Sequence, residues 1–167
     1  MGERSVPLIR PATDADRPAI WDALQPVIRA GETLALPRDM TREDALAYWF
    51  EPGHEVFVAD VDSGELGGTY FVHANHRGGG SHVANCAYVT AHRAAGRGFA
   101  RAMAEHSLAH AKERGFRAMQ FNFVVSTNGA AVHLWTALDF GIVGTLPGAF
   151  VHPTLGDVDA HVMYRRL

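Results

Sequence analysis

The sequence predicts a mixed α/β fold in which about four helices flank a mostly antiparallel sheet of six to seven strands. Three observations lead to this fold class. Apolar segments of strand length occur before, between and after segments of helical period. Three strand segments follow one another directly between residues 55 and 90, which favours antiparallel pairing. The resulting order of elements is β-α-α-β-β-β-α-β-α-β-β.

The first elements are a strand and a helix. The apolar segment "VPLIR" at 6–10 predicts a short strand. Thr13 is expected to begin the helix that follows, with Asp16 three residues later as an imperfect capping box. Pro26 should kink or end this helix, because proline lacks the N–H that the helix interior requires.

A second helix and three strands come next. The helix is expected at 41–50, with Thr41 as its N-cap. Strands are expected at 55–61 and 66–73 on either side of "DSG", which is typical of a hairpin turn. A flexible connection then leads to a strand at 82–90.

The period changes to that of a helix between Gly98 and Arg114. One face of this segment is apolar and consists of Ala100, Met103, Ala104, Leu108 and Ala111. Gly115 follows as the expected C′ residue, because glycine readily adopts the left-handed conformation that ends many helices.

The last third of the chain is expected to complete the sheet. "RAMQFNFVV" at 117–125 predicts a central strand, and 129–140 predicts a helix. Two closing strands are expected at 142–150 and 158–167, around a loop at 151–157. These closing strands and their loop are expected to support a homodimer.

Composition narrows the classes of protein. The 167 residues, 47% of them hydrophobic, predict one domain over 1–167. A net charge of −3 gives no reason to expect nucleic-acid binding. No stretch approaches the 18 apolar residues of a membrane span. The single cysteine, Cys86, cannot form an internal disulfide, which suits a reducing, cytoplasmic location.

The glycine-rich segment "AAGRGFARAM" at 94–103 leads from a strand into a helix. Unpaired N–H groups at a helix N-terminus bind phosphate oxygens well, and Arg97 and Arg101 add positive charge. An ordinary glycine turn is the alternative. The segment is neither a P-loop, since no Gly-Lys-Ser/Thr follows, nor a dinucleotide fingerprint, whose third glycine would fall at Arg101.

This loop with its following strand and helix resembles the GNAT superfamily of acyl-CoA N-acyltransferases. The family loop reads Arg/Gln-x-x-Gly-x-Gly/Ala, and its amides hold the pyrophosphate of coenzyme A. One register of the pattern begins here at Arg93 and another at Ala95. We favour the second, which places Met103 where the family has a leucine facing the core. Its departure from the pattern is Ala95, for which Arg93 or Arg97 could supply the missing charge.

The helix after the central strand carries the resemblance further. GNAT enzymes often have Asn, then Ala three residues later, then Leu-Tyr six and seven residues later. The residues at those spacings here are Asn128, Ala131, Leu134 and Trp135. In relatives the tyrosine is proposed to protonate the departing thiolate. Trp135 has only an indole N–H donor and cannot act as that acid, so its roles would be to pack on the pantetheine or to pack in the core.

The resemblance covers about 55–150 and implies acetyl-CoA as cosubstrate, with no metal. The implied coenzyme contacts are Val89, Thr90, Ala95, Gly96, Arg97, Gly98, Phe99, Ala100, Arg101, Asn128 and Trp135. Asn128 is also expected to cap the helix that follows it.

The strings "HVAN", "QFNFVVSTN" and "HPTLG" resemble one GNAT branch more closely. That branch is the yeast-type N-acetyltransferases that act on L-azetidine-2-carboxylate and related proline analogues. The resemblance implies that Asn85 and Asn122 bind the carboxylate of a small amino or imino acid. Each side-chain amide offers two N–H donors, so two such groups could hold a carboxylate without a buried cation. A bond between the two asparagines, or to backbone, is the structural alternative.

The sequence contains fewer signals for the groups that would catalyse the acetyl transfer. Many GNAT enzymes have a glutamate on the strand before the glycine loop, but 82–90 contains no carboxylate. Deprotonation of the amine would then proceed through water, or the amine would bind neutral. Tyr88 and His82 are the titratable candidates, and a backbone N–H near Tyr88 or Val89 is expected to hold the oxyanion. Direct transfer is favoured over an acyl group on Cys86.

Rival functions stay open at this point. A protein N-terminal or polyamine acetyltransferase is one, and the carboxylates Asp60, Asp62, Glu65 and Glu55 would suit a polyamine. An acyl-CoA-binding sensor without activity is another, favoured by Trp135 and the missing glutamate. A metal site is discounted, because Ser107 rather than a glutamate follows His106, so the helical pair His106 and His110 does not form the HExxH motif of metalloproteases.

Overall fold

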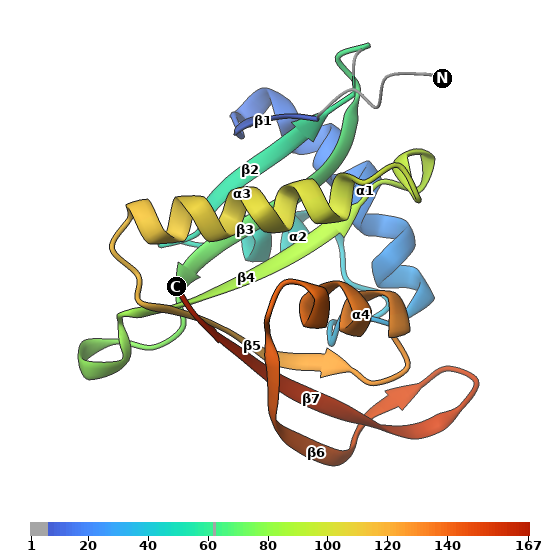
Figure 1. Cartoon of the computed structure of the whole chain (residues 1–167). Coiled ribbons are helices and arrows are strands. Elements are labelled where there is room, and N and C mark those ends of the chain that lie inside the picture. The colour runs from blue at the N-terminus through green and yellow to red at the C-terminus, as the bar shows by residue number, and fades with distance from the viewer. Residues whose placement is uncertain (1–6, 62) are drawn as a thin grey trace, which may run out of the picture.

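The computed structural model describes residues 7–61 and 63–167, and in this part of the chain it contains seven strands and four α-helices (Figure 1). The helices are α1 (Arg17–Ala30), α2 (Arg42–Trp49), α3 (Phe99–Glu113) and α4 (Gly129–Ala137). The strands are β1 (Leu8–Pro11), β2 (Glu55–Asp60), β3 (Leu66–Ala74), β4 (Val83–Thr90), β5 (Ala118–Val125), β6 (Gly141–His152) and β7 (Gly156–Arg166). The expected fold class and order of elements are confirmed.

All the strands belong to one sheet with the order β1-β2-β3-β4-β5-β7-β6. Every neighbouring pair is antiparallel except β4 and β5, which are parallel. The α3 helix makes the crossover between these two parallel strands, as a parallel connection requires. The expectation of a mostly antiparallel sheet is therefore confirmed.

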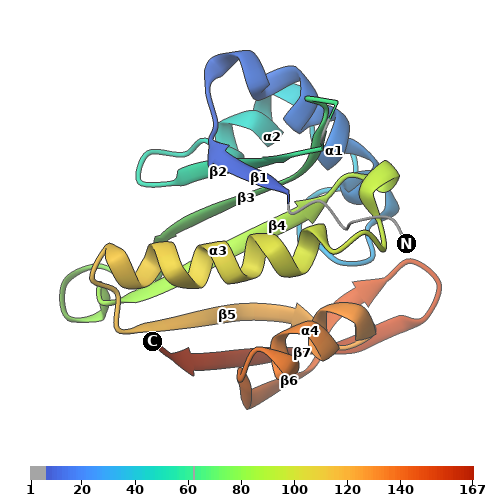
Figure 2. The same cartoon turned by 45° about the horizontal axis from the view of Figure 1, so that its top comes forward.

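The helices divide between the two faces of the sheet (Figures 1 and 2). The first core lies under α3 and α4 and includes Tyr70, Cys86 and Met103. The second lies under α1 and α2 and includes Trp49 and Phe71. Tyr70 and Phe71 are consecutive on β3 and enter opposite cores, because side chains alternate along a strand.

The helix capping follows the sequence signals closely. The Oγ1 of Thr41 accepts a hydrogen bond from the Asp44 N–H at 3.1 Å, which confirms Thr41 as the cap of α2. At the first helix, the Asp16 carboxylate accepts from the Thr13 N–H at 2.7 Å. These residues form a short 3-10 turn, and α1 itself begins only at Arg17.

Several expected boundaries need correction. The α1 helix does not end at Pro26 but runs through it to Ala30. Buried residues lie on both sides of Pro26, including Leu24 and Ile28, so packing outweighs the missing N–H. The closing strands are longer than expected, and only 153–155 separate β6 from β7. Residues 6 and 62, at the first strand and the first hairpin turn, lie outside the described residues.

The two parallel strands separate soon after they begin. Pairing between β4 and β5 is limited to Val83 with Ala118 and Ala84 with Met119. Beyond these pairs the strands diverge, and α4 lies beside their open end (Figure 2). The separation exposes the facing edges of both strands, so the sheet itself opens a site between them.

Candidate active site

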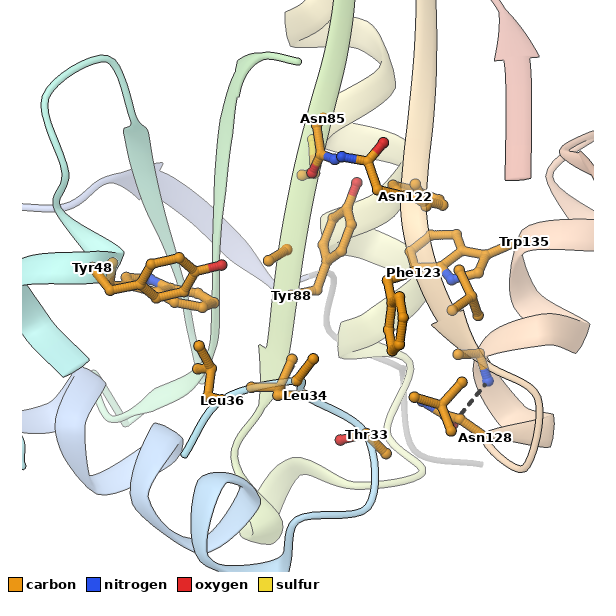
Figure 3. A pocket seen from close by; sticks show the side chains of 18 residues that line it. Thr33, Leu34, Leu36, Tyr48, Asn85, Tyr88, Asn122, Phe123, Asn128 and Trp135 are labelled. Atoms are coloured by element: carbon orange, nitrogen blue, oxygen red, sulfur yellow. Dashed lines mark hydrogen bonds between the residues drawn. The ribbon is translucent and has the colours of Figure 1, made fainter. Parts of the chain in front are cut away.

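A cleft of about 320 Å³ occupies the gap between the separated strands β4 and β5 (Figure 3). Its lining residues are Thr33, Leu34, Ala35, Leu36, Tyr48, Trp49, Asn85, Cys86, Ala87, Tyr88, Phe121, Asn122, Phe123, Val124, Val125, Asn128, Ala131 and Trp135. None of these lining residues carries an acidic or basic side chain. The polar groups of the wall are amides, hydroxyls, a thiol and two indoles, in a mostly apolar surface typical of a small-molecule site.

Asn85 and Asn122 point toward each other across this gap, and their nitrogen atoms are adjacent (Figure 3). The Nδ2 atoms of both side chains donate to a single oxygen, Oδ1 of Asn75, at 3.2 Å from Asn85 and 2.7 Å from Asn122. The two amides therefore present converging N–H donors. The structural alternative considered from sequence, a bond between the two asparagines themselves, is replaced by a bridge through Asn75.

Asn122 reaches this position through an irregularity in its strand. The pairing of β5 with β7 shifts between Phe121 and Val124, which oppose Met163 and His161. Asn122 and Phe123 thus lie in a β-bulge, which commonly redirects a side chain at a functional site. Phe121 is buried in the core, whereas Asn122 is exposed. An amide can lie between two phenylalanines here because the Asn122 side chain is exposed and does not enter the core that contains Phe121.

Tyr88 and Trp135 form an aromatic wall of the cleft. Their ring centroids are 5.0 Å apart, and Trp135 also packs on Phe121 at 4.4 Å. The hydroxyl of Tyr88 is hydrogen-bonded to Ser107 on α3 at 2.6 Å. Burial raises the pKa of Tyr88 well above its ordinary value. The phenol is therefore neutral near pH 7 and unsuited to act as a general base.

Cys86 and the backbone of β4 also face the gap. Burial raises the pKa of the Cys86 thiol to about 12, so the thiol is protonated near neutral pH. The N–H of Asn75 donates to the Val83 carbonyl and the N–H of Ala91 donates to Gly67, both across the β3–β4 pair. Backbone groups alternate in direction along a strand, so the N–H of Tyr88 points toward the β5 side.

The same alternation turns the N–H of Val89 toward β3, away from the gap. Val89 is 3% exposed. Neither Val89 nor Thr90 belongs to the cleft lining. Of the two oxyanion positions considered from sequence, the structure favours Tyr88. His82 also lies outside the lining, and its carbonyl accepts from the Arg117 N–H at 2.8 Å.

Asn128 lies where the cleft meets α4. Its Oδ1 accepts from the Ala131 N–H at 3.3 Å, which confirms that it caps the helix. The side chain also lines the cleft. The cap fixes the oxygen on the helix, and the amide nitrogen of Asn128 is then the group that could contact a ligand.

The glycine loop forms a second part of the site, outside the cleft lining. Gly96 and Gly98 have φ values of 72° and 86°, a conformation that side-chain-bearing residues rarely adopt, and Gly98 is the N-cap of α3. Some backbone N–H groups of this loop have no hydrogen-bond partner among the residues that the structure describes. They belong to Gly96, Gly98, Phe99, Ala100 and Arg101.

This row of free donors at a helix N-terminus fits the phosphates of a nucleotide-type ligand. The arginines of the loop are mostly engaged nearby: Arg93 pairs with Glu65 at 3.2 Å and Arg101 with Glu105 at 2.9 Å, both on the exposed surface. Arg97 lies over the ring of Phe99 at 5.7 Å.

Sequence reasoning missed one wall of the cleft and one residue behind its lining. The segment after α1 supplies Thr33, Leu34, Ala35 and Leu36, and Tyr48 of α2 completes that wall. Asn75 is the other omission. The segment "HANH" is visible in the sequence, but only the register of β3 against β4, in which His73 opposes Asn85, brings Asn75 beside Asn85.

Of the first hairpin, Glu55, Asp60 and Glu65 lie outside the cleft lining, and so do the helical histidines His106 and His110. Glu55 accepts from His110 and pairs with Arg114, and Asp60 pairs with Arg10 at 2.7 Å. His106 is hydrogen-bonded to the Tyr70 hydroxyl at 2.7 Å. Asp62, the remaining carboxylate considered for a polyamine, is outside the described residues.

Comparison with known proteins identifies the family. The model of the acetyltransferase (GNAT) family matches residues 20–140, which is most of the chain. The chain belongs to the GNAT family. A GNAT structure from Kribbella flavida is 41% identical, with a TM-score of 0.92 over 97% of this chain and 98% of that one. The match to this relative includes nearly every described element.

Two further relatives are more distant. N-acetyltransferase aca1 of Schizosaccharomyces pombe is 26% identical over 137 residues, and the match covers 73% of this chain and 66% of that protein. This chain therefore corresponds to slightly less than two thirds of that relative. A GNAT phosphinothricin acetyltransferase from Sinorhizobium meliloti, solved in complex with acetyl-CoA, is 17% identical with a TM-score of 0.86. The match covers 98% of this chain and 89% of the relative, and the two proteins share the GNAT fold.

The helix phase agrees with the GNAT register that begins at Ala95. In that register Gly98 immediately precedes the helix and Met103 faces the core. The structure has Gly98 as the N-cap of α3 and Met103 at 0% exposure. In the alternative register, which begins at Arg93, the cap residue Gly98 would be the second glycine of the family pattern. In the register that begins at Ala95 it is the first.

No helix among the described residues is both long and apolar enough to cross a bilayer.

Proposed function

We propose that this protein transfers the acetyl group of acetyl-CoA to the amine of a small amino or imino acid, such as the proline analogue azetidine-2-carboxylate. Membership of the GNAT family supports the acetyl transfer. The observation that carries the choice of acceptor is that Asn85 and Asn122 both line a cleft without charged side chains, with their Nδ2 atoms held side by side by the one oxygen of Asn75 behind it. A carboxylate oxygen has the acceptor character that such a pair of donors requires.

The remaining wall suits the body of a small ring. Leu34, Leu36 and Phe123 are apolar, and Tyr48 lies on the far side of the cleft from Trp135 (Figure 3). A cleft of about 320 Å³ is at the lower end of the range for small-molecule sites. A long cationic acceptor such as a polyamine is disfavoured, because the lining has no carboxylate to meet its ammonium groups.

Acetyl-CoA supplies an activated thioester, and the protein supplies orientation and donors. The free N–H groups at the start of α3 are the groups that would hold its pyrophosphate. The Tyr88 N–H, which points into the gap, would donate to the developing oxyanion. The acceptor amine would lose its proton to water or bind neutral, since the cleft wall contains no carboxylate or histidine.

The first experiment separates an enzyme from a sensor. Acetyl-CoA should raise the melting temperature of the protein. Thiol release should then be measured with azetidine-2-carboxylate, proline, spermidine and a peptide with a free N-terminus. We expect release with the small acids. Stabilisation by acetyl-CoA without release on any amine would instead favour the sensor.

The second experiment tests the carboxylate site. Replacement of Asn122 by alanine removes one donor to a charged oxygen, which is typically worth about 1.5–3 kcal/mol. The KM for the acid is therefore expected to rise by roughly 10- to 100-fold, with little change in the KM for acetyl-CoA. Gln25→Ala, which removes an exposed amide from α1 outside the cleft, is the matched control. An unchanged KM for the acid in Asn122→Ala would show that Asn122 does not bind the carboxylate.

The homodimer and the cytoplasmic location stay predictions.

A further inference from the structure

Asn75 forms the link between the two asparagines of the cleft. It follows the last residue of β3, and its backbone N–H donates to Val83 on β4 at 2.8 Å. Its side chain then lies diagonally across the strand pair from Asn85. Oδ1 of Asn75 accepts from both Asn85 and Asn122, as described above. Asn75 does not itself line the cleft.

This position fixes which way the two neighbouring amides face. An amide side chain has an acceptor end and a donor end, and only the donor end can meet the oxygen of Asn75. Asn122 is held at its other end too, because Gln120 donates to Asn122 Oδ1 at 2.9 Å. Each Nδ2 has a second N–H beyond the one given to Asn75. For Asn122, whose oxygen accepts from Gln120, this second N–H is the amide group left for a ligand, whereas an amide oxygen in its place would repel an acid.

The nitrogen of Asn75 provides an independent observation. Its Nδ2 is buried and has no hydrogen-bond partner among the described residues. Leaving a buried donor unpaired is unfavourable, so an apolar side chain of similar size would suit a purely structural position better. The burial also means that a ligand in the cleft does not reach Asn75 directly. The two accepted hydrogen bonds are thus the useful feature of this side chain.

We propose that Asn75 is a positioning residue that gives the site its preference for acids, by holding Asn85 and Asn122 with their donors toward the acceptor's carboxylate. This inference rests on the proposed function. Without Asn75, the Asn85 amide can rotate about its last bond and offer oxygen as readily as nitrogen, and Asn122 is held by Gln120 alone. Binding of a carboxylate then has to select the correct orientation of Asn85, which weakens affinity for the acid.

The test compares azetidine-2-carboxylate with its methyl ester, which keeps the amine and the ring but has no charged oxygen. Asn75→Leu removes the accepting oxygen and keeps the branching of the side chain at Cγ. We expect the KM for the acid to rise about tenfold, the loss typical of one hydrogen bond to a charged group. The KM values for the ester and for acetyl-CoA should stay within about twofold of wild type, so the preference for the acid should fall about tenfold.

Asn75→Asp is the second variant, because it is isosteric and keeps an oxygen facing both donors. It places negative charge behind the site, so the acid should again lose affinity while the ester is acetylated as by wild type. His76→Ala, at the exposed neighbouring position, is the control and should leave both substrates unaffected.

The outcomes separate the two proposals. If the wild-type enzyme does not prefer the acid to the ester, the proposed function fails and this inference fails with it. If the wild type prefers the acid and both Asn75 variants keep that preference, only the role of Asn75 is overturned. Equal losses on acid and ester would likewise assign Asn75 a structural role.

Discussion

Cys86 is a nucleophilic residue in the wall of the cleft, yet its environment argues against covalent catalysis. Its side chain is 6% exposed, and its thiol donates to the Met119 sulfur at 3.8 Å. With the pKa raised to about 12 by burial, only on the order of one thiol in 100,000 is ionised at pH 7. Because the thiolate is the nucleophilic form, direct attack of the amine on the thioester is the easier route.

Replacement of Cys86 by alanine should therefore leave kcat within about threefold of wild type, at a loss of stability of about 1 kcal/mol from the small cavity. Steady-state kinetics and urea unfolding measure the two effects. Mass spectrometry of the wild-type protein incubated with acetyl-CoA should find no acetyl group on Cys86. A folded Cys86→Ala enzyme with less than one hundredth of the wild-type kcat would establish an acyl-enzyme route instead.

The residues of the site differ in how far sequence could predict them. The cap formed by Asn128 depends on a residue three positions away, so local pattern was sufficient. Asn122 could be singled out because an amide is unexpected in an apolar strand, and Asn85 through the resemblance to the azetidine-2-carboxylate branch. Asn75 and Leu34 could not, because both lie in connecting segments. Their places depend on strand register and on how the segment after α1 packs, which periodicity does not encode.

At the scale of elements, the first residue of α3 packs directly against the backbone of β3. A Cβ atom added to Gly67 would lie 2.2 Å from the ring of Phe99, the first residue of α3. The ring of Phe99 is therefore seated directly on the backbone of β3. Because Phe99 follows the glycine loop, this contact also sets the height above the sheet of the N–H groups that we propose to hold the pyrophosphate.

Gly67→Ala is expected to displace the first turn of α3, because the added methyl group overlaps the ring rather than a flexible chain end. Overpacking of this kind costs about 1–3 kcal/mol of unfolding free energy. The KM for acetyl-CoA should rise more than the KM for the acceptor. Gly79→Ala, where a Cβ would meet nothing within 4 Å, is the matched control. Equal stability and equal KM values in Gly67→Ala and wild type would refute the role of this contact.

Helices and strands were predictable wherever local chemistry determines them. Thr41 caps α2 and Gly115, with φ of 88°, follows the end of α3, both as the residue types indicate. Pro26 shows the limit of such reasoning, since packing of Leu24 and Ile28 carries α1 through it. The β-bulge at Asn122 could not be predicted from the sequence either, because it is defined by the pairing of β5 with β7.

At the scale of the whole molecule, one ion-pair network ties the start of the chain to the sheet. Arg10 on β1 pairs with Asp16, just before α1, at 2.9 Å and with Asp60 on β2 at 2.7 Å. The hydrogen bond from Arg10 is the main cause that lowers the pKa of Asp16 to about 2, from an ordinary value of 3.8. The network thus joins the edge of the sheet to the helix that covers the second core.

The direction of the pKa shift sets the pH dependence of stability. A carboxyl group whose pKa is lower in the folded state binds its proton more weakly there than in the unfolded chain. The stabilisation by Asp16 is therefore fully present above about pH 4 and is lost as the pH falls toward 2. Because the Arg10 side chain is 38% exposed, solvent screening limits the contribution to about 1 kcal/mol.

Asp16→Asn should accordingly be less stable than wild type by about 1 kcal/mol at pH 7, and the difference should narrow steadily below pH 4. Urea unfolding from pH 7 to pH 3 measures it. Burial also lowers the pKa values of His73 and His106, and their protonation destabilises the fold as the pH drops below their ordinary value of 6.5. Both histidines are present in wild type and variant, so their effect cancels in the difference. A difference that stays constant down to pH 3 would mean that Asp16 acts through packing or capping rather than through its charge.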